Sequence, residues 1–369
     1  MPKYIYQNKE WPALQWDNSV EVTALLNDVI CLQGRLLGKM EMVGFDLRTE
    51  ASLETITQDV IKSSEIEGEI LNLQQVRSSV AIRLGVDIPG IIAAERHVDG
   101  VVDMMLDATQ HFDKTLTVER LFGWHNALFP TGRSGLYTIT AGNWRNDENG
   151  PMQVISGGYS KQHIHFEAPQ AALLDKEMNQ FLQWFNAAQT TAHPIIKAAL
   201  AHLWFITLHP FDDGNGRIAR ALTDLLLSRA DGIPQRFYSM SAQIQKDRSN
   251  YYDILEATQK GNLNITGWVV WFLTCLQKAL VASALTLDKI VFKHNFWADN
   301  AGKIENQRQR MMLDKLLTGF EGNLTAAKWA KITKTSPDTA LRDINALITN
   351  NILKKSDAGG RSTSYELVM

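Results

Sequence analysis

The chain has 369 residues and a formal net charge of −3, with 45% hydrophobic and 21% charged residues. This length exceeds that of a usual single core, so we expect two or three structural units. The weak charge excludes a protein that coats nucleic acid or anionic lipid over its whole surface. We see neither a bilayer-spanning apolar run nor a secretion signal, and we expect Cys31 and Cys275 to be buried thiols. A cytoplasmic protein without a membrane segment is therefore predicted.

Apolar residues recur every three or four positions in the first part of the chain, which predicts helices. The expected helices cover residues 20–42, 53–64, 73–84, 91–106 and 118–129. The next segment, 135–169, is rich in glycine and contains two short alternating stretches, 152–155 and 163–166. These stretches predict a small β-hairpin with Gly157 and Gly158 at its turn side.

Helical periodicity resumes after the hairpin. Further helices are expected over residues 174–187, 194–208, 218–230, 251–260 and 268–287. After a connector over about 285–306, the chain shows three more helical stretches and two strands that flank DAGGRST: helices 305–317, 326–332 and 338–350. This order resembles a winged-helix module. The expected domains are 1–110, 111–285 and 300–369.

The clearest chemical pattern is HPFDDGNGRIAR, which spans residues 209–220 and joins two predicted helices. Backbone N–H groups at a helix start have no intrahelical partner and lie at the positive end of the helix dipole. Gly214, Asn215 and Gly216 can therefore approach a phosphate closely and donate hydrogen bonds to it. The segment predicts an anion site where the second helix begins.

Charged side chains surround this predicted anion site. Asp213 can hold Mg²⁺, which prefers a carboxylate together with phosphate oxygens and water. Arg217 and Arg220 are three residues apart and share one helix face, where their guanidinium groups can bind terminal phosphates. His209, with an ordinary pKa of about 6.5, can accept a proton from an attacking hydroxyl near neutral pH.

The twelve residues match every fixed position of the Fic family signature, which is His, Pro, Phe, any, Asp or Glu, Gly, Asn, Gly, Arg, any, any, Arg. The resemblance extends through AALAHLWFITL and DRSNYYDILEATQKGN and covers most of residues 110–280. It implies a mainly α fold: a Fic helical core with a small β-hairpin flap, an N-terminal helical region and a C-terminal winged helix. It also implies an enzyme that transfers AMP from ATP to a Ser, Thr or Tyr hydroxyl of a protein, this chain included, and releases pyrophosphate.

The resemblance assigns a role to each motif position. His209 would be the general base, Asp213 the Mg²⁺ ligand and the 214–216 segment the anion hole, while Arg217 and Arg220 would bind the β- and γ-phosphates. Further nucleotide-binding residues come from the flap and from the alignment on YY: Val154, Ile155, Ser156, Gly157, Tyr251 and Gln259. Gly216 stands where a kinase-like branch of the family has lysine, which favours AMP transfer.

A second Fic pattern lies upstream, where Ser63, Glu67 and Gly68 match the inhibitory sequence of the family and end a helix over about 53–68. The resemblance implies that Glu67 pairs with Arg220, occupies the fork meant for the γ-phosphate and repels that phosphate. Such a charge-assisted bond contributes about 1.5–3 kcal/mol, so its loss is expected to raise activity by roughly one to two decades.

Several alternatives stay open from the sequence. The protein could instead be a nucleotide-sensing transcription regulator, with DNA as a partner of the C-terminal domain, or it could remove AMP from a modified protein. The tail from Glu305 has ten basic and seven acidic residues, and Asp338 and Asp343 on its longest helix oppose DNA binding. His163 and His165 alternate on a strand, but we find no matching carboxylate, so flap structure is preferred to metal binding. A homodimer is an alternative to a monomer.

Overall fold

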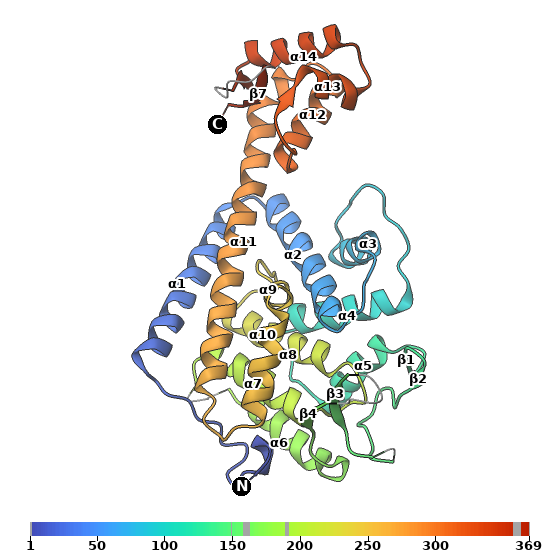
Figure 1. The fold of residues 1–369 in the computed structure, drawn as a ribbon, viewed down its shortest axis with the longest axis vertical. Coiled ribbons are helices and arrows are strands. Elements are labelled where there is room, and N and C mark those ends of the chain that lie inside the picture. The colour runs from blue at the N-terminus through green and yellow to red at the C-terminus, as the bar shows by residue number, and fades with distance from the viewer. Residues whose placement is uncertain (1, 149, 158–162, 189–191, 357–362, 369) are drawn as a thin grey trace. The chain divides into compact units, whose positions relative to one another are not determined.

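The computed structural model describes residues 2–148, 150–157, 163–188, 192–356 and 363–368. Two compact units divide the chain, one over Met1–Thr286 and one over Leu287–Met369. Helices dominate both units (Figure 1), which confirms the predicted mainly α fold. The predicted inhibitory segment and the Fic-like motif belong to the same unit, whereas the predicted domain boundary near residue 110 stays a prediction.

Among the described residues of the first unit, ten helices precede the long helix α11. They are α1 (Val20–Met42), α2 (Phe45–Ile66), α3 (Leu73–Leu84), α4 (Arg96–Gln110), α5 (Val118–Leu128), α6 (Leu174–Asn186), α7 (Pro194–Leu208), α8 (Asn215–Asp231), α9 (Met240–Lys246) and α10 (Arg248–Gln259). Short 3₁₀ turns cover Ile5–Gln7 and Ala171–Leu173. The predicted bounds of α1, α3 and α7 coincide with those observed, because their apolar periodicity begins and ends at these residues.

Helices α2 and α4 begin well away from their predicted starts, and one helix was not predicted. Helix α2 begins at Phe45, directly after its N-cap Gly44. This early start was not predicted, because the first turns of the helix are mostly polar and show no apolar repeat. Helix α4 begins only after its N-cap Glu95. The short helix α9 is capped by Ser239, whose hydroxyl accepts a hydrogen bond from the Ala242 N–H at 2.9 Å. A helix of this length is too short to show periodicity.

Helices α7 and α8 form the centre of the first unit (Figure 1). Nearly every side chain of α7 is buried, as expected for a helix that is apolar on all sides. Helix α8 packs against α7, α4 and α5, and it begins in the loop that carries the predicted anion site. The motif therefore lies between two core helices, which fix the positions of its side chains.

The N-terminal region packs directly on this core. Gln15 pairs with the opposite segment through hydrogen bonds from its N–H to the Leu263 carbonyl at 2.8 Å and from the Ile265 N–H to its own carbonyl at 2.7 Å. Helix α2 lies against α9, where Asp59 accepts a hydrogen bond from the Ser241 N–H at 3.3 Å. Cys275 is buried, but Cys31 on α1 is exposed, so the prediction of two buried thiols was wrong for Cys31. It lies on the polar face of an amphipathic helix.

Two small antiparallel hairpins lie in the first unit. Strands β1 (Arg133–Ser134) and β2 (Tyr137–Thr138) form one, and β3 (Gln153–Ser156) and β4 (His163–Glu167) form the other. The second is the predicted hairpin, with a register shift between Val154 and Ile155. Gly158 lies outside the described residues. The base of this hairpin is anchored by an aromatic cluster in which Tyr4 and Tyr6 pack on Phe166.

Helix α11 (Thr266–Asn300) continues through the segment predicted as a connector, and the boundary between the two units falls within it. The sequence analysis expected no membrane-spanning segment, yet this helix is long and apolar enough to cross a membrane by length and composition. Core helices of soluble proteins meet the same criterion. The start of α11 is packed in the first unit, where buried Trp268 donates a hydrogen bond to the Ala199 carbonyl at 2.8 Å.

The second unit has its own core, centred on buried Trp329, Ile344 and Leu347. A 3₁₀ turn (Ala301–Lys303) precedes its other elements, which are α12 (Gln307–Thr318), β5 (Leu324–Thr325), α13 (Ala326–Thr333), α14 (Pro337–Thr349), β6 (Leu353–Lys355) and β7 (Ser364–Leu367). The strands form one antiparallel sheet in the order β5-β7-β6. Asp343 is buried against Arg308, with Oδ2 accepting from Nε at 2.8 Å, so this carboxylate is neutralised by its partner.

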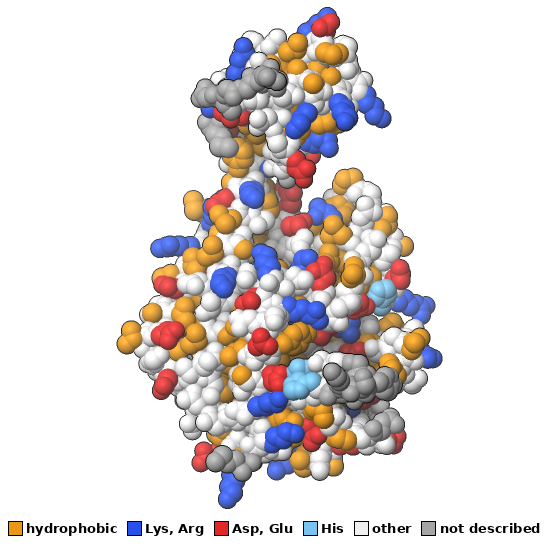
Figure 2. All heavy atoms as spheres, viewed as in Figure 1, with side chains coloured by type: hydrophobic (Ala, Val, Ile, Leu, Met, Phe, Trp, Pro, Cys, Tyr) orange, Lys and Arg blue, Asp and Glu red, His pale blue; other side chains and the backbone are white. Residues whose placement is uncertain are grey.

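Charges of both signs are interspersed over the face drawn in Figure 2. The described residues of this face show no broad basic area. This mixed surface agrees with the weak net charge of the chain.

Candidate functional site

The loop between α7 and α8 begins with a strained residue. His209 is the C-cap of α7 and has φ 48° and ψ 57°, a left-handed conformation that a non-glycine residue rarely adopts. Its N–H donates to the Phe205 carbonyl at 3.0 Å. Arg145 fixes the same residue from the other side, because its Nε donates to the His209 carbonyl at 2.8 Å. The imidazole is thereby held at the start of the motif.

The hydrogen bonds of His209 define its tautomer. Nδ1 lies 3.3 Å from the Ile206 carbonyl, which can only accept, so Nδ1 carries the proton and the lone pair is at Nε2. Burial, opposed by the Ile206 carbonyl and assisted by the charge of Arg145, lowers the pKa of His209 to about 4. A neutral imidazole with a lone pair on Nε2 is the form that a general base requires.

The next part of the loop presents backbone N–H groups. The side-chain amide of Asn215 closes it by accepting from the Phe211 N–H at 3.0 Å and donating to the Phe211 carbonyl at 2.7 Å. Gly214 is the N-cap of α8 at φ 79°, and a Cβ there would lie 2.9 Å from the Phe129 ring. The bond from the Ile218 N–H to the Gly214 carbonyl is the first of the helix, so the N–H groups of 215–217 remain for an anion.

Asp213 lies beside this cradle and is held by its neighbours. Oδ1 accepts from the Gly214 N–H at 2.5 Å, and Oδ2 accepts from the Ser134 hydroxyl of β1. The Asp213 carbonyl accepts from Nε2 of His125 at 3.2 Å, while Nδ1 of His125 accepts from the Gly142 N–H at 3.0 Å. Burial lowers the pKa of His125 to about 4, so this ring is neutral. The carboxylate is therefore fixed in position at the pocket.

Both predicted phosphate-binding arginines are buried and contact carboxylates. Nη2 of Arg220 lies 2.8 Å from Oε1 of Glu67, and its Nε donates to the Ser63 hydroxyl at 2.8 Å. Nη1 of Arg217 donates to Oε2 of Glu69 at 2.7 Å. Among the described residues, Nη1 of Arg220 and Nε of Arg217 are buried without a hydrogen-bond partner. Buried donors of this kind require an acceptor, and phosphate oxygens would supply one.

The end of α2 brings the two glutamates to these arginines. Gly68 adopts φ 85°, the Glu69 N–H donates to the Ser64 carbonyl at 3.0 Å, and the Gly68 N–H donates to the Glu65 carbonyl at 3.0 Å. This pair of bonds is a Schellman motif, which stops a helix at a glycine. Glu67 is then the C-cap, and Glu69 lies two residues beyond it. A rigid helix end therefore presents both carboxylates to α8.

Gly216 makes room for one of them. A Cβ built on this residue would lie 2.0 Å from Oε1 of Glu67, which is far inside van der Waals contact. Any side chain at position 216 therefore conflicts with the observed place of the Glu67 carboxylate. The glycine that the family resemblance connects with AMP transfer has a second role here, because it allows the Glu67–Arg220 contact.

A cavity of about 630 Å³ lies between the loop, α10 and the β3–β4 hairpin. Its lining includes His209, Asp213 and the 214–216 segment, together with Glu67. From the other predicted residues it includes Val154, Ile155, Ser156, Tyr251 and Gln259. Gly157 is exposed, and neither it nor Arg217 or Arg220 is among the described lining residues. The structure thus gathers most of the predicted residues around one cavity.

Tyr251 and Gln259 are buried on α10 and are held by polar contacts. The Tyr251 hydroxyl lies 2.9 Å from Nε2 of His202, and burial raises the pKa of this tyrosine. Nε2 of Gln259 donates to the Thr207 hydroxyl at 3.3 Å. Both side chains are therefore rigid parts of the pocket wall.

Four residues near the motif were missed by the sequence analysis: Glu69, Ser134, His125 and Tyr252. The Tyr252 hydroxyl donates to the Ile66 carbonyl at 3.2 Å and so joins α10 to the end of α2. Glu69 could have been noticed as a second acid beside Gly68. The other three carry no sequence signal, because they approach the motif only through the packing of distant segments.

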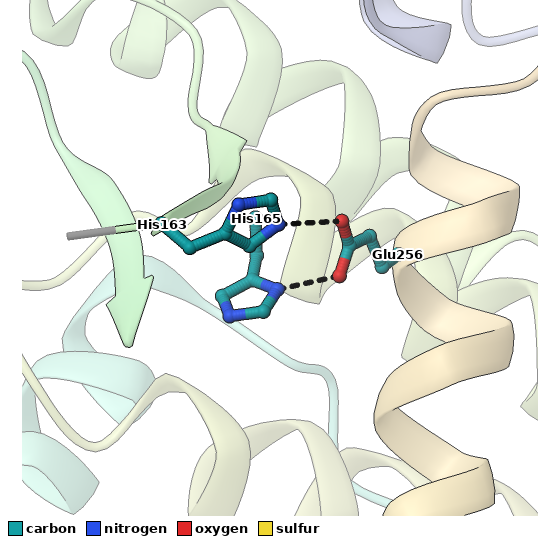
Figure 3. Close-up of side chains that lie close together, drawn as sticks. All are labelled: His163, His165 and Glu256. Atoms are coloured by element: carbon teal, nitrogen blue, oxygen red, sulfur yellow. Dashed lines mark hydrogen bonds and ion pairs between the residues drawn. The ribbon is translucent and has the colours of Figure 1, made fainter. Parts of the chain in front are cut away.

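The conclusion that no carboxylate matches the two flap histidines was wrong. A carboxylate does accompany His163 and His165, since Glu256 of α10 lies 2.5 Å from Nδ1 of His165 (Figure 3). It is about ninety positions away in the chain, so spacing could not reveal it.

Residues 115–227 match the family model described as Fic/DOC family, which assigns this segment to a Fic/DOC domain. Residues 4–86 match a domain of unknown function, DUF4172.

Individual relatives agree with this assignment. The protein named "Protein adenylyltransferase Fic" from Drosophila sechellia is 30% identical over 240 residues, which are 62% of this chain and 42% of that protein. The chain thus spans less than half the length of this relative. In fold, the chain is similar to a Fic family protein from Desulfovibrio desulfuricans G20, with a TM-score of 0.53 and 20% identity over 96% of this chain and 97% of the other. It is also similar to a Fic domain containing signaling protein from Bacteroides thetaiotaomicron, with a TM-score of 0.51 and 18% identity over 73% and 97%.

Proposed function

We propose that this protein transfers AMP from ATP to a Ser, Thr or Tyr hydroxyl of a protein. The observation that carries the proposal is the neutral His209, which has a lone pair on Nε2. This residue lines the same pocket as the start of α8. The substrate hydroxyl attacks the α-phosphate and gives its proton to Nε2, and the bond to the pyrophosphate leaving group breaks. The name of the Drosophila relative supports the same reaction.

The residues of α8 suit the binding of the leaving pyrophosphate. Helix-start N–H groups and two buried guanidinium groups supply fixed donors, and fixed donors stabilise charge that develops in a transition state. The orphaned Nη1 of Arg220 and Nε of Arg217 would gain phosphate acceptors. Asp213 lines the pocket beside the start of α8 and fits Mg²⁺, which usually binds one or two carboxylates together with phosphate oxygens, and the ion would neutralise phosphate charge there.

The hairpin would hold the protein substrate. Strand β3 pairs only with β4 among the described residues, so its other edge is free to add a strand. Ile155 on this strand is 49% exposed although it is apolar, which suits a contact that a bound segment would cover. Strand addition would place a substrate hydroxyl beside the pocket that contains His209.

We propose that the protein restrains its own activity with Glu67 and Glu69. Each carboxylate contacts one of the arginines assigned to the terminal phosphates, at 2.8 Å and 2.7 Å respectively. ATP would have to displace both contacts and would meet negative charge where its β- and γ-phosphates must bind. The signal that releases α2 would therefore activate the enzyme.

We propose that the second unit is a winged-helix module, because its helices and strands follow the order of that motif, and that it contacts protein or DNA. Arg308 pairs with Asp343 and offsets its negative charge, so Asp343 would repel DNA phosphates less than an unpaired carboxylate. The few cysteines suit a cytoplasmic protein.

The test compares label transfer from α-labelled ATP with Mg²⁺ and cell extract as a source of substrate. Glu67→Gly should raise protein labelling by roughly one to two decades over the parent. Glu65→Gln is the matched control, because Glu65 ends the same helix but pairs with Lys62 at 2.7 Å. The double variant Glu67→Gly, His209→Ala should give no label. Label that is independent of His209, or no label from any variant, would contradict the proposed function.

A further inference from the structure

Three metal-binding side chains meet beside the hairpin. His163 and His165 are two residues apart on β4, so they project from the same face of the strand. Figure 3 shows both imidazoles directed toward the Glu256 carboxylate of α10. One ligand atom from each residue lies within 4.8 Å of the other two. No other group of three His, Cys, Asp or Glu side chains comes this close within the described part of the chain.

The ligand atoms converge on a small space. Nδ1 of His165 lies 2.5 Å from Oε2 of Glu256, and Nε2 of His163 lies 3.7 Å from Oε1. The two rings are nearly perpendicular, with centroids 4.5 Å apart. A tetrahedral zinc ion with bonds of about 2.0–2.2 Å separates its ligand atoms by about 3.4 Å. Modest side-chain rotation would produce that spacing, because none of the three side chains is tightly packed.

A neighbouring hydroxyl already fixes one ring as metal sites require. Nε2 of His165 lies 2.6 Å from the Ser156 hydroxyl of β3. If Nδ1 binds a cation, Nε2 must carry the proton and donate it to this hydroxyl. A histidine ligand whose second nitrogen is hydrogen-bonded in this way is held in the correct tautomer and orientation.

We propose that His163, His165 and Glu256 bind a divalent transition metal of the zinc type, which clamps the β3–β4 hairpin to α10. Two imidazoles and a carboxylate are a known kind of zinc ligand set, with a fourth position open to water. Mg²⁺ prefers oxygen ligands, so this site is chemically distinct from the one proposed at Asp213. Ser156, His165 and Glu256 also line the cavity, so the ion would hold the hairpin at its mouth.

One cation competes with the metal. Lys260 Nζ lies 2.5 Å from Oε1 of Glu256 in an i,i+4 pair whose side chains are 35% and 26% exposed. Exposed pairs of this kind are weak, so a coordinated dication can displace the ammonium group. Removal of the Lys260 charge should leave metal binding at least as tight.

The test is a binding titration of the untagged, chelator-stripped full chain with Zn²⁺ by calorimetry and with Co²⁺ by visible absorption, without nucleotide. We expect one equivalent to bind with a micromolar or lower Kd and a tetrahedral cobalt spectrum. His163→Ala and Glu256→Gln should each weaken binding at least tenfold, and Lys260→Gln should not weaken it. His97→Ala is the matched control, because His97 is a surface histidine 3.6 Å from Glu95 and should leave the Kd unchanged.

Zinc should also slow amide hydrogen exchange in residues 153–156 and 163–167 of the parent but not of His163→Ala. His163 is 64% exposed, so this substitution does not threaten the fold. No binding by the parent, full binding by both ligand variants, or binding without slower exchange would overturn the proposal. None of these readouts involves AMP transfer, so the metal clamp and the proposed enzyme activity can fail separately.

Discussion

Oε2 of Glu69 lies 2.7 Å from Nη1 of Arg217. Glu69 follows two residues after Glu67, which contacts Arg220. The two carboxylates come from one helix end and the two arginines from one helix face. The contact proposed to be inhibitory is therefore double, although the family pattern in the sequence names only Glu67.

We predict that Glu69→Gln raises protein labelling a few-fold, less than Glu67→Gly does. The Glu69 side chain is 36% exposed against 30% for Glu67, so its ion pair is weaker. Arg217 also stacks on Phe129 and stays partly held when the Glu69 carboxylate is removed. The double variant should exceed both single variants without reaching the product of their effects, because the sites share one helix end. Initial labelling rates at subsaturating ATP measure this. A Glu69→Gln rate equal to that of the parent would remove Glu69 from the inhibitory contact.

Gly216→Ala should weaken the restraint by Glu67. The new methyl carbon would lie 2.0 Å from the present position of Oε1 of Glu67, so the carboxylate must move away from Arg220. The ratio of labelling rates between Glu67→Gly and its parent should therefore shrink in the Gly216→Ala background. Comparing backgrounds cancels any direct effect of the methyl group on phosphate binding. An unchanged ratio would show that Glu67 restrains the enzyme without this close approach.

The pH dependence of kcat/KM should reflect the low pKa of His209. Because burial lowers this pKa to about 4, the base is already neutral at pH 6. We expect kcat/KM of Glu67→Gly to lose little between pH 8 and pH 6 through this group, with its acid limb at or below pH 4, because the variant lacks the Glu67 charge that raises the His209 pKa. An acid limb centred near 6.5 would instead indicate a solvated histidine in the active form.

Stability should fall as the pH is lowered from about 6.5. Burial lowers the pKa of His125 and His209 to about 4 and that of His202 to about 3, so below pH 6.5 the unfolded chain binds protons that the folded chain does not. Each histidine then costs up to about 1.4 kcal/mol per pH unit until its folded pKa is reached.

Urea unfolding at several pH values, followed by tryptophan fluorescence, measures this slope. His125→Gln should reduce it by the share of one histidine. A slope that is the same in the parent and in this variant would mean that His125 does not resist protonation.

The sequence predicted the elements that depend on local pattern. Helices α1, α3 and α7 have uninterrupted apolar periodicity, and their observed bounds match the approximate predicted ones. The polar start of α2, the short α9 and the continuation of α11 were not predicted, because their extent depends on packing partners rather than on periodicity.

The sequence by itself determined the chemistry of the site, because the residues of HPFDDGNGRIAR are consecutive and a helix start places them together. Only the tertiary structure decided which distant groups reach that site. Glu69 meets Arg217 because a Schellman turn directs it there, and Glu256 meets His163 and His165 because α10 packs beside β4. Contacts between residues far apart in the chain follow from how helices pack, and no local spacing encodes that.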